Sequence, residues 1–341
     1  MQWQNSSIET PMQLLSMSHG LIIQQALYCA AMLGIADLLK DGPQTTTELA
    51  RHLEVNESAL YRVLRLLASQ NVFAEASPRA FANSKLSHYL RSGVPDSIRS
   101  ILMFRGSELF YRPFEEILYS VRTGKSARTK VLGMDGWEYL KQHPDLARVF
   151  DDAMTDMSAI IGPRVAAAYD FGRWGSIMDV GGGNGILLAS ILKAHPKARG
   201  VLADLPHVLE RAGQREFLGG ELQARSTMQP CDFFREVPSG CRAYVMKNVI
   251  HDWDDEHAGE ILANCRRAVP ADGALLLVEW TLDEGNLYSA GKLFDVVMLV
   301  MTGGKERTAE EYRRLLAGAG FRINEVIPTP CEFSIIEALP E

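Results

Sequence analysis

SIMDVGGGNGILL, residues 176–188, predicts a buried strand, a glycine-rich turn and the start of a helix. The apolar run before the glycines is typical of a parallel strand, and residues 186–195 carry apolar side chains at helical spacing. Glycine permits a tight turn and a close approach of the backbone to a ligand. Because the free amides at a helix start favour an anionic group, this order predicts the ligand-binding edge of an α/β sheet.

The spacing of the glycines separates two classes of cofactor. A dinucleotide fingerprint, G-x-G-x-x-G, that starts at Gly181 would need a third glycine where the chain has Ile186. The sequence instead fits G-x-G-x-G through Gly181, Gly183 and Gly185, with Asp179 just ahead. This pattern resembles the first motif of S-adenosylmethionine (AdoMet) methyltransferases, whose cofactor carries a carboxylate and no phosphate. The alternative interpretation is a plain strand-to-helix turn.

A second apolar segment, residues 201–204, ends in an acid. Asp204 lies 19 residues after Gly185 and is followed by Leu205 and Pro206. A carboxylate at the end of a second strand can accept hydrogen bonds from both hydroxyls of a ribose. Asp204 and Leu205 are therefore candidate cofactor residues. Helix capping by Asp204 is the alternative, because a Leu-Pro pair can begin a helix.

Five segments occur in an order that matches a known family: DVGGGNG, ADLPHV, CDFF, KNVIHDWDDE and GGKERT. The chain resembles the small-molecule O-methyltransferases of the caffeic acid, flavonoid and hydroxyindole type, which also occur in bacteria. The resemblance covers nearly the whole chain. It implies a Rossmann-like α/β methyltransferase domain, AdoMet as the methyl donor, S-adenosylhomocysteine as the product, and no metal.

The length of 341 residues is enough for two domains. We predict a helical, winged-helix dimerisation domain over residues 1–100. The AdoMet-binding catalytic domain, with the acceptor-pocket helices, is predicted over residues 101–341. The net charge of −7 at pH 7 argues against a general nucleic-acid binder, which usually carries a basic face.

The cysteines and the apolar segments indicate a cytoplasmic protein without a membrane partner. The five cysteines are scattered without a C-x-x-C pair, which argues against a disulfide framework or zinc cluster and for a reducing compartment. Residues 1–6 lack the basic flank and apolar core of a signal peptide. The apolar segment 21–39 is interrupted by Gln24, Gln25 and Asp37 and predicts a buried or dimer-forming helix.

Residues 12–40 predict one or two helices with apolar side chains on most faces. A helix that is apolar all round must be buried. In so small an N-terminal region, the cover we expect is a second subunit. The family resemblance implies the same, because its N-terminal domains interlock in a homodimer.

A winged-helix pattern follows. Thr45 with Glu48 makes a capping-box pattern for one helix, and Asn56 can cap the next. Residues 72–75 and 80–83 then predict two short strands. Alone, this pattern would indicate DNA binding, but the presumed recognition helix offers two arginines beside an acid and many apolar residues. We expect a structural or dimerising role.

The rest of the chain predicts a parallel sheet. Residues 86–119 are expected to be helical, and a helix through residues 150–158 leads towards Phe171, with Gly162-Pro163 interrupting it. Strands then alternate with helices, which is the signature of an α/β fold. The predicted strands are residues 177–180, 200–204, 244–247, 274–279, 321–327 and 332–338.

The candidate general base is His251, in a loop that follows a predicted strand ending at Lys247. Transfer of a methyl group to a hydroxyl is an in-line displacement that benefits from proton removal, and histidine titrates near neutral pH. Glu279 and Glu306 match the family positions that flank the catalytic histidine. Singly, the three could be a loop histidine, a strand-end surface acid and an acid at a helix start.

The resemblance also implies further cofactor contacts. Asp232 and Phe233 match the pair that meets adenine, although the family usually has glycine where this chain has Cys231. Lys247 matches the residue near the methionine carboxylate. Trp253 could cover the adenine or be a core tryptophan. The full cofactor set is Asp179, Gly181, Gly183, Asp204, Leu205, Asp232, Phe233, Lys247 and Trp253.

The acceptor pocket is assigned by matching position to position. Met157 stands where many relatives have histidine, which removes a polar contact. Methionine and phenylalanine at helical spacing could equally fill a core. The candidate acceptor residues are Phe150, Met154, Met157, Asn248, Met298, Met301 and Thr302.

The sequence as a whole predicts an AdoMet-dependent O-methyltransferase for a small, aromatic, hydroxylated metabolite. A C- or N-methyltransferase or related tailoring enzyme of the same fold is the first alternative, and a ligand-responsive winged-helix regulator is the second. The acids at 252, 254 and 255 are dense enough to raise a metal site, but acids at a helix start more often compensate its dipole.

Overall fold

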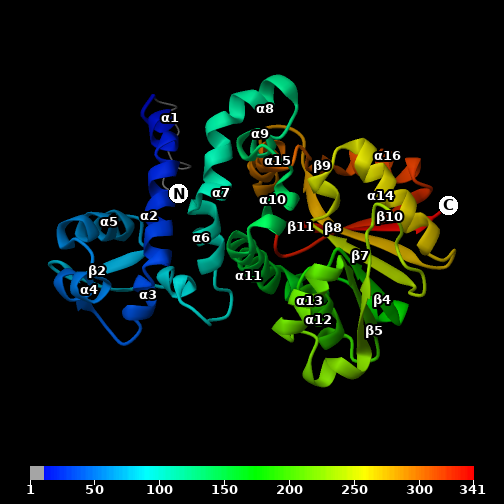
Figure 1. The fold of residues 1–341 in the computed structure, drawn as a ribbon, viewed down its shortest axis with the longest axis horizontal. Helices are drawn as coiled ribbons and strands as arrows, with labels where there is room; N and C mark the ends of the chain where they lie inside the picture. The colour runs from blue at the N-terminus through cyan, green and yellow to red at the C-terminus, as the bar shows by residue number, and fades with distance from the viewer. Residues whose placement is uncertain (1–10) are drawn as a thin grey trace. The chain divides into compact units, whose positions relative to one another are not determined.

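The computed structural model describes residues 11–341, so the start of the chain, where no signal peptide was expected, lies outside the described residues. Backbone packing divides the chain into two compact units. The first runs up to Tyr111 and includes Asp145–Asp156, and the second comprises Arg112–Pro144 and Met157–Glu341. Figure 1 labels the elements. The domain limits 1–100 and 101–341 stay a prediction, because this grouping does not test which segment folds alone.

The first unit is built of helices and one small sheet. Its antiparallel sheet has the order β1-β3-β2. The strands are β1 Gln44–Thr45, β2 Phe73–Ser77 and β3 Ala80–Asn83. The helices are α1 Pro11–Ser18, α2 Gly20–Met32, α3 Ile35–Leu38, α4 Thr46–Leu53, α5 Glu57–Ser69, η2 Ser87–Leu90, α6 Arg99–Gly106 and α7 Glu108–Tyr111.

The winged-helix prediction is confirmed in this unit. The Thr45 side chain accepts from the Glu48 amide at 3.2 Å, and the Glu48 carboxylate accepts from the Thr45 amide at 2.8 Å, so the capping box starts α4. Asn56 caps α5 through the Ala59 amide. The hairpin β2-β3 follows α5, and its buried Phe73 joins a core of α2, α4 and α5 side chains.

The second unit contains the large sheet, whose order is β10-β11-β8-β7-β4-β5-β6, with β9 pairing β8 outside this path. The run β8 to β6 is parallel, whereas β11 pairs antiparallel with β8 and with β10. The strands are β4 Ser176–Val180, β5 Arg199–Asp204, β6 Ser226–Pro230, β7 Ala243–Lys247, β8 Ala274–Leu282, β9 Arg307–Thr308, β10 Phe321–Pro328 and β11 Phe333–Pro340.

Helices cover both faces of this sheet (Figure 1). Side chains of α11 and α12 pack on one face with Ile177 and Val245, and those of α14 and α16 pack on the other with Met178 and Tyr244. The helices of the second unit are η3 Arg112–Glu116, α8 Ile117–Thr123, α9 Ala127–Leu132, α10 Gly136–Gln142, η4 Phe171–Trp174, α12 Ile186–Ala194, α13 Pro206–Arg215, η5 Gly220–Arg225, η6 Ile250–Asp252, α14 Asp255–Ala268, α15 Ala290–Met301 and α16 Ala309–Gly318. Helix α11, Pro144–Ala168, contributes residues to both units.

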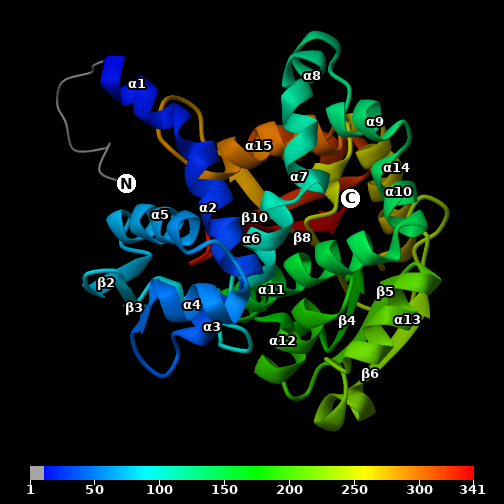
Figure 2. The same ribbon diagram turned by 60° about the vertical axis from the view of Figure 1, so that its left-hand side comes forward.

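The sheet topology fixes where a ligand can bind. From β4 the chain passes to β5 on one side and later to β7 on the other, so the strand order reverses between β4 and β7. Ligands of open α/β sheets bind outside the carboxyl ends of the strands at such a reversal. Strands β4 and β5, labelled in Figure 2, lie side by side in the sheet.

Several details of the sequence-based fold were wrong or missing. The stretch 86–119, expected to be helical, is interrupted by a non-helical segment at residues 91–98. The predicted break at Gly162-Pro163 does not occur, because α11 continues through Pro163 to Ala168. Burial of the neighbouring side chains stabilises the helix more than the missing N–H of Pro163 weakens it, since Ile161 and Val165 lie in the core. Gly162 packs closely on α12, because a Cβ there would lie 2.7 Å from the Ser190 hydroxyl. Strand β6 was not predicted, because four of its five residues are exposed and it lacks an apolar run.

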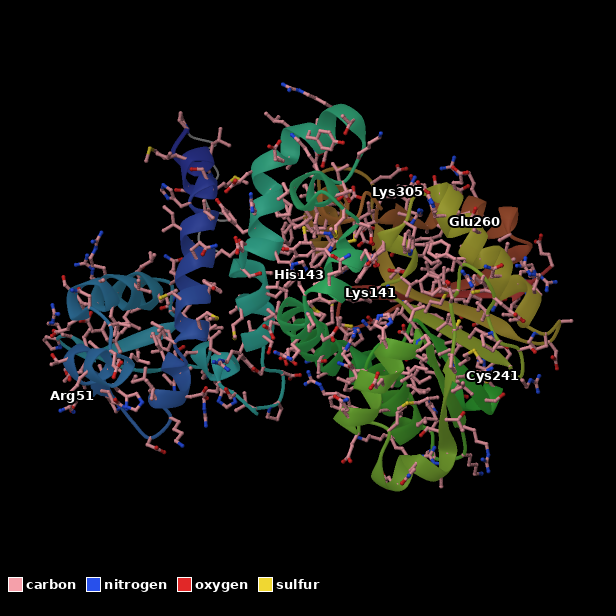
Figure 3. The ribbon with its side chains drawn as sticks, in the orientation of Figure 1. Arg51, Lys141, His143, Cys241, Glu260 and Lys305 are labelled. Atoms are coloured by element: carbon pink, nitrogen blue, oxygen red, sulfur yellow. The ribbon has the colours of Figure 1, made fainter. Side chains whose placement is uncertain are left out.

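The thiols match the expected absence of a disulfide framework. All five cysteines lie within the described residues, and each is free. Cys241, labelled in Figure 3, is buried just before β7. Among residues 11–341, no helix is both long and apolar enough to cross a bilayer.

Helices α1 and α2 expose apolar side chains within the single chain. Leu14 is 72% exposed, Met17 69% and Ile22 57%, and α1 buries none of its residues. Monomeric proteins rarely leave an apolar surface of this kind uncovered. These helices are therefore the surface on which we expect the second subunit.

We expect a dimer in solution, with twice the 37.8 kDa chain mass in sedimentation at low micromolar concentration. Ile22→Glu places a charge on the apolar surface and should shift the protein towards monomer. Glu48→Gln, on the exposed start of α4, is the control and should stay dimeric. A wild-type monomer, or a well-folded monomer after deletion of residues 1–40, would contradict this expectation.

Candidate active site

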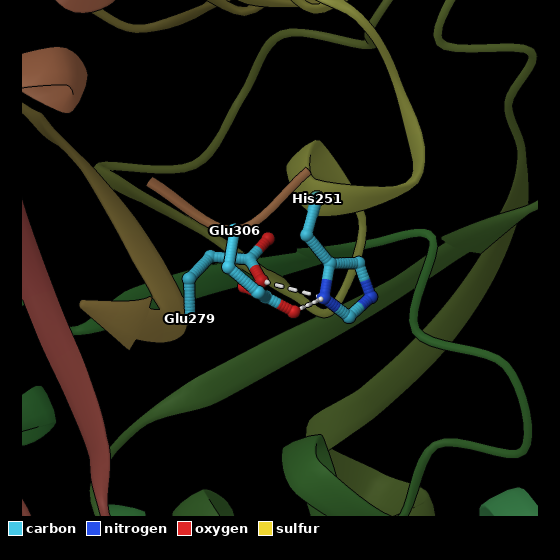
Figure 4. Close-up of side chains that lie close together, drawn as sticks. All are labelled: His251, Glu279 and Glu306. Carbon is cyan, nitrogen blue, oxygen red and sulfur yellow. Dashed lines mark hydrogen bonds and ion pairs between the residues drawn. The ribbon is translucent and has the colours of Figure 1, made fainter. Parts of the chain in front are cut away.

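Three buried ionisable side chains meet just beyond the carboxyl end of β7, beside β8 (Figure 4). His251 Nδ1 lies 2.7 Å from Glu306 Oε1 and 3.6 Å from Glu279 Oε2. His251 is 5% exposed, Glu279 0% and Glu306 2%. The structure therefore brings together the three residues that the sequence proposed as a base with two acidic partners.

Each of the three residues comes from a different segment. His251 lies in the short helix η6, just beyond β7, and Glu279 lies within β8. Glu279 Oε1 accepts from the amides of Val249 and Ile250 at 3.1 and 2.9 Å, so one oxygen of this acid holds the loop that presents His251. Its other oxygen, Oε2, faces His251 Nδ1 and makes no hydrogen bond.

Glu306 sits in a loop, residues 302–306, that packs directly against the His251 loop. A Cβ on Gly304 would lie 2.1 Å from the His251 carbonyl oxygen and 2.4 Å from the Asp252 carbonyl carbon. The Lys305 amide donates to the His251 carbonyl at 2.9 Å. Because only glycine fits at 304, the two loops can approach closely enough for Glu306 to reach His251.

Arg307 holds the two loops together from behind. Its guanidinium is fully buried and donates to the carbonyls of Ile250 at 3.2 Å and Trp253 at 2.9 Å. It also donates twice to Asp255 Oδ1, at 2.9 and 3.0 Å, while Lys305, labelled in Figure 3, donates to Asp255 Oδ2. The GGKERT motif is visible in the sequence, but these roles of Gly304 and Arg307 were not predicted from it.

The electrostatics of the cluster favour a proton on the imidazole. Burial lowers the pKa of His251, but the neighbouring Glu279 and Glu306 outweigh it and raise the pKa to about 10. Burial raises the pKa of Glu279 to about 7, against the opposing effect of His251. His251 and Glu279 therefore interact strongly, and the two titrate as a pair.

The same three residues could geometrically hold a metal ion. One ligand atom from each of His251, Glu279 and Glu306 lies within 4.8 Å of the others. The hydrogen bond from His251 Nδ1 to Glu306 accounts for this spacing without an ion. The neighbouring acids have other partners, since Asp254 caps α14 through the His257 amide and Asp255 binds Arg307.

The glycine-rich turn has the backbone that the sequence predicted. Gly181, Gly183 and Gly185 all have positive φ, at 69°, 57° and 80°, and Gly185 precedes α12. A Cβ on Gly183 would meet nothing within 4 Å, so open space lies beside this turn. Asp204 Oδ2 accepts from the Gly183 amide at 2.9 Å and Oδ1 from the Leu205 amide at 2.7 Å. Asp204 therefore links the end of β5 to the glycine turn that follows β4, and it lies two residues before the start of α13.

Asp179 and Lys247 are the charged pair at the strand reversal. Burial raises the pKa of Asp179 to about 7, although Lys247 acts in the opposite direction, and Asp179 Oδ2 has no hydrogen bond. Burial lowers the pKa of Lys247, while Asp179 and Glu279 oppose this. Within residues 11–341, the Lys247 side chain makes no hydrogen bond or ion pair. Asp179 Oδ2 and the Lys247 ammonium can therefore each form a further hydrogen bond beside the glycine turn.

The candidate adenine residues lie beside the same turn. A Cβ on Gly181 would be 3.4 Å from Phe233 and 3.0 Å from Val249, so the Phe233 ring borders the turn. Asn264 holds Phe233 by donating to its carbonyl at 2.7 Å, and Asp232 Oδ1 accepts from the Phe234 amide. The turn at Cys231 is nevertheless formed: its amide donates to the Asp204 carbonyl at 2.9 Å.

Trp253 has contacts on the core side. Its ring packs edge-on against Phe234, with ring centroids 4.7 Å apart, and belongs to the fringe of the core that includes α14. These contacts fit the core alternative, and they leave the assignment of Trp253 to the cofactor as a prediction.

The candidate acceptor residues fall into two groups. Met298 and Met301 are buried in α15, and Thr302 donates to the Met298 carbonyl at 3.1 Å. Asn248 has a positive φ of 54° and a buried Oδ1 without a hydrogen bond. A non-glycine residue that has a positive φ and a buried side-chain oxygen without a hydrogen bond is typical of ligand sites.

The other acceptor candidates lie on α11. Met157 packs against the core face that includes α12. Phe150 and Met154 belong to the first unit, where Phe150 meets Phe104 edge-on with ring centroids 5.5 Å apart. Their role in an acceptor pocket stays a prediction.

Both parts of the chain match family models. Residues 15–93 match the O-methyltransferase dimerisation domain, and residues 114–322 match the O-methyltransferase domain.

Among curated relatives, the phenazine O-methyltransferase PhzM of Lysobacter antibioticus is 43% identical over 96% of this chain and 95% of its own length. The 3-amino-4-hydroxybenzoate 4-O-methyltransferase of Streptomyces cremeus is 37% identical over 96% of this chain and 89% of its own length. The phenazine-1-carboxylate N-methyltransferase of Pseudomonas aeruginosa is 31% identical over 98% of both chains. The relatives thus include O- and N-methyltransferases.

Solved structures match over almost the whole chain. LaPhzM has a TM-score of 0.92 and 42% identity, covering 98% of this chain and 100% of its own. CalO1, a methyltransferase of calicheamicin biosynthesis in its S-adenosylhomocysteine-bound form, has a TM-score of 0.87 and 32% identity, covering 98% and 100%. NcsB1, an O-methyltransferase bound to AdoMet and 2-hydroxy-5-methyl naphthoic acid, has a TM-score of 0.79 and 31% identity, covering 93% and 96%.

The family model of the O-methyltransferase domain covers more than half of the chain, and the relatives align over nearly their full lengths. This chain therefore belongs to the O-methyltransferase family, whose members methylate small molecules with AdoMet.

Proposed function

We propose that this enzyme methylates a hydroxyl group of a small aromatic acceptor, with His251 as the general base. The observation that carries the proposal is the short contact between His251 Nδ1 and Glu306, which leaves Nε2 as the free nitrogen of the ring. Within residues 11–341, Nε2 makes no hydrogen bond, and its nearest acid is Asp252 at 4.0 Å.

The proton path follows from the two ring nitrogens. With Nδ1–H donating to Glu306, a neutral His251 carries its lone pair on Nε2. Nε2 then accepts the proton of the acceptor hydroxyl, and the resulting imidazolium lies beside two carboxylates. The carboxylates stabilise this positive charge and fix the ring orientation, as the acid of a catalytic triad does.

The residues at the strand ends fit AdoMet. Asp179 Oδ2 and Lys247 offer unused polar groups, Gly183 borders open space, and Phe233 presents a ring beside Gly181. We propose that Asp204 binds the ribose, Asp232 and Phe233 the adenine, and the glycine turn with Asp179 and Lys247 the methionine end. When bound, AdoMet supplies a methyl group made electrophilic by its sulfonium sulfur.

We propose that Met298, Met301, Thr302 and Asn248 line the acceptor pocket, joined by Met157 of α11. Methionine is unbranched and flexible, which suits the packing of a flat ring. NcsB1 binds a naphthoic acid, and the Streptomyces cremeus relative acts on a hydroxybenzoate, which supports an aromatic acceptor. The exposed apolar surface of α1 and α2 and the dimerisation-domain match support a homodimer.

N-methylation is the second candidate, because relatives such as the phenazine-1-carboxylate N-methyltransferase share the fold. An amine with a free lone pair needs no base before it attacks, whereas a hydroxyl does. The buried His251 cluster therefore favours the hydroxyl acceptor. The regulator alternative is not retained, since the chain belongs to an enzyme family.

Asp204→Ala should weaken binding of S-adenosylhomocysteine by about 1–3 kcal/mol, because a charged hydrogen-bond acceptor is lost. Isothermal titration calorimetry measures this directly. Asp272→Ala, which removes an exposed acid that pairs Arg242 at the opposite edge of the sheet, is the control and should bind normally. Binding of NAD with no response to S-adenosylhomocysteine would refute the cofactor assignment.

His251→Ala should lower turnover about 10²- to 10⁴-fold, the range for loss of a general base, with nearly unchanged affinity for S-adenosylhomocysteine. Glu279→Gln and Glu306→Gln should each lower turnover less, and their double variant should be less than additive because both act through one imidazole. A chelator should leave the rate unchanged. Wild-type turnover of His251→Ala on a weakly acidic phenol would exclude the base assignment.

The rate should rise as the pH increases from neutrality and level off above about pH 10, because only neutral His251 can accept a proton and its pKa is raised to about 10. Glu306→Gln removes one of the charges that raise this pKa, so the rise should occur at lower pH even though turnover falls. The pH profile of kcat/KM on one phenol tests this. If the rise of kcat/KM occurred at the same pH in Glu306→Gln as in the wild type, a group other than His251 would control it.

A further inference from the structure

We propose that Arg128 is an anchor for the carboxylate of the acceptor, so that the preferred acceptors are aromatic hydroxy acids. The proposal deepens the proposed function, because it rests on transfer of the methyl group to a hydroxyl held at His251. The sequence alone predicted no role for Arg128.

The Arg128 guanidinium is buried without a hydrogen-bond or ion-pair partner. Arg128, in α9, is 4% exposed, and its Nε makes no hydrogen bond. Across residues 11–341, the Arg128 side chain forms no ion pair and no hydrogen bond. A buried charge is costly unless it is paired and hydrogen-bonded, so this guanidinium has donors available for a ligand.

Neighbouring residues define the position of the guanidinium. A Cβ on Gly136 would lie 2.1 Å from Arg128 Cζ and 2.2 Å from its Nε, so the guanidinium occupies the space that this glycine leaves. The ring of Trp137 lies with its centroid 5.5 Å from Cζ. These contacts hold the charge against the start of α10.

Helix α9 is joined to the active-site loops. Ser126, which caps α9, donates to the carbonyls of Val300 and Met301 at 3.2 and 3.0 Å. A Cβ on Gly303 would lie 3.5 Å from the Ser126 amide nitrogen, and the next residue, Gly304, packs on the His251 loop. Arg128 is therefore two residues from a contact with the loop that carries Glu306.

The charges around Arg128 leave room for an anion. Asp252, whose side chain is 16% exposed, lies on the Nε2 side of His251 and within electrostatic range of Arg128, but no N···O distance of 4.0 Å or less joins the two. Asp135 also attracts the positive charge of Arg128, and its Oδ1 accepts hydrogen bonds from the amides of Trp137 and Glu138. Burial lowers the pKa of Arg128 and both acids oppose this, so the guanidinium stays charged.

The chemistry of the guanidinium selects the ligand class. Its planar donors match a carboxylate in bidentate geometry better than any neutral group. A molecule that reaches both His251 Nε2 and Arg128 needs a hydroxyl at one place and an acid at another. A rigid aromatic ring with both substituents satisfies this requirement.

Two variants separate the charge from its position. Arg128→Met removes the charge and keeps a long apolar side chain. Gly136→Ala keeps the charge but places a methyl group where the guanidinium lies. Arg122→Met, at an exposed arginine on α8, is the matched control.

The test is calorimetric binding to the full-length enzyme saturated with S-adenosylhomocysteine. The probes are 2-, 3- and 4-hydroxybenzoate, each compared with the hydroxybenzamide of the same geometry. At least one acid should bind the wild type and the Arg122→Met control about 10- to 100-fold more tightly than its amide, as expected for a buried charged hydrogen bond. Arg128→Met should abolish this preference while amide binding persists, and Gly136→Ala should reduce it. The melting temperature of Arg128→Met should be unchanged or higher, because an unpaired buried charge is removed.

Equal binding of acids and amides by the wild type, or an acid preference that survives Arg128→Met, would overturn the proposal. So would a fall in melting temperature with loss of both ligand classes, because that result assigns Arg128 to the fold. Failure of the proposed function would differ: acid preference would depend on Arg128, yet no phenol would be methylated in the presence of AdoMet.

Discussion

The buried guanidinium of Arg307 is the interaction on which the active site depends. It donates to the carbonyls on either side of His251, those of Ile250 and Trp253, and to the carboxylate of Asp255 at the start of α14. Arg307 directly follows Glu306 in the chain. A single side chain thus fixes the loop of His251 relative to Glu306, although the two segments are separated by α14, β8 and α15.

A second constraint is steric and comes from Gly304. The loops touch backbone to backbone at this residue, where any Cβ would overlap the His251 carbonyl. The hydrogen bonds of Arg307 hold the two loops together, and the missing side chain of Gly304 lets their backbones touch. His251 Nδ1 and Glu306 can therefore lie 2.7 Å apart. Without this approach, the carboxylate would not raise the pKa of His251, and the imidazole would lose its fixed orientation.

The sequence predicted those parts of the molecule that follow from local pattern. The apolar run before Gly181, the acid at the end of β5 and the loop after β7 all lie at strand ends, and parallel strands bring their carboxyl ends to one edge. The sequence could not show what depends on three-dimensional packing. Strand β6 has no apolar run, the proline in α11 is overridden by burial, and Arg128 is informative only because it is buried without a hydrogen-bond or ion-pair partner.

Glu279 and Glu306 both face His251, yet their contacts give them different tasks. Glu306 meets Nδ1 directly at 2.7 Å, and its own amide is held by Asp295. Glu279 lies farther from Nδ1, at 3.6 Å, and uses Oε1 to hold the amides of Val249 and Ile250. A change at Glu306 therefore acts on the basicity of the ring, whereas a change at Glu279 also releases the loop that carries it.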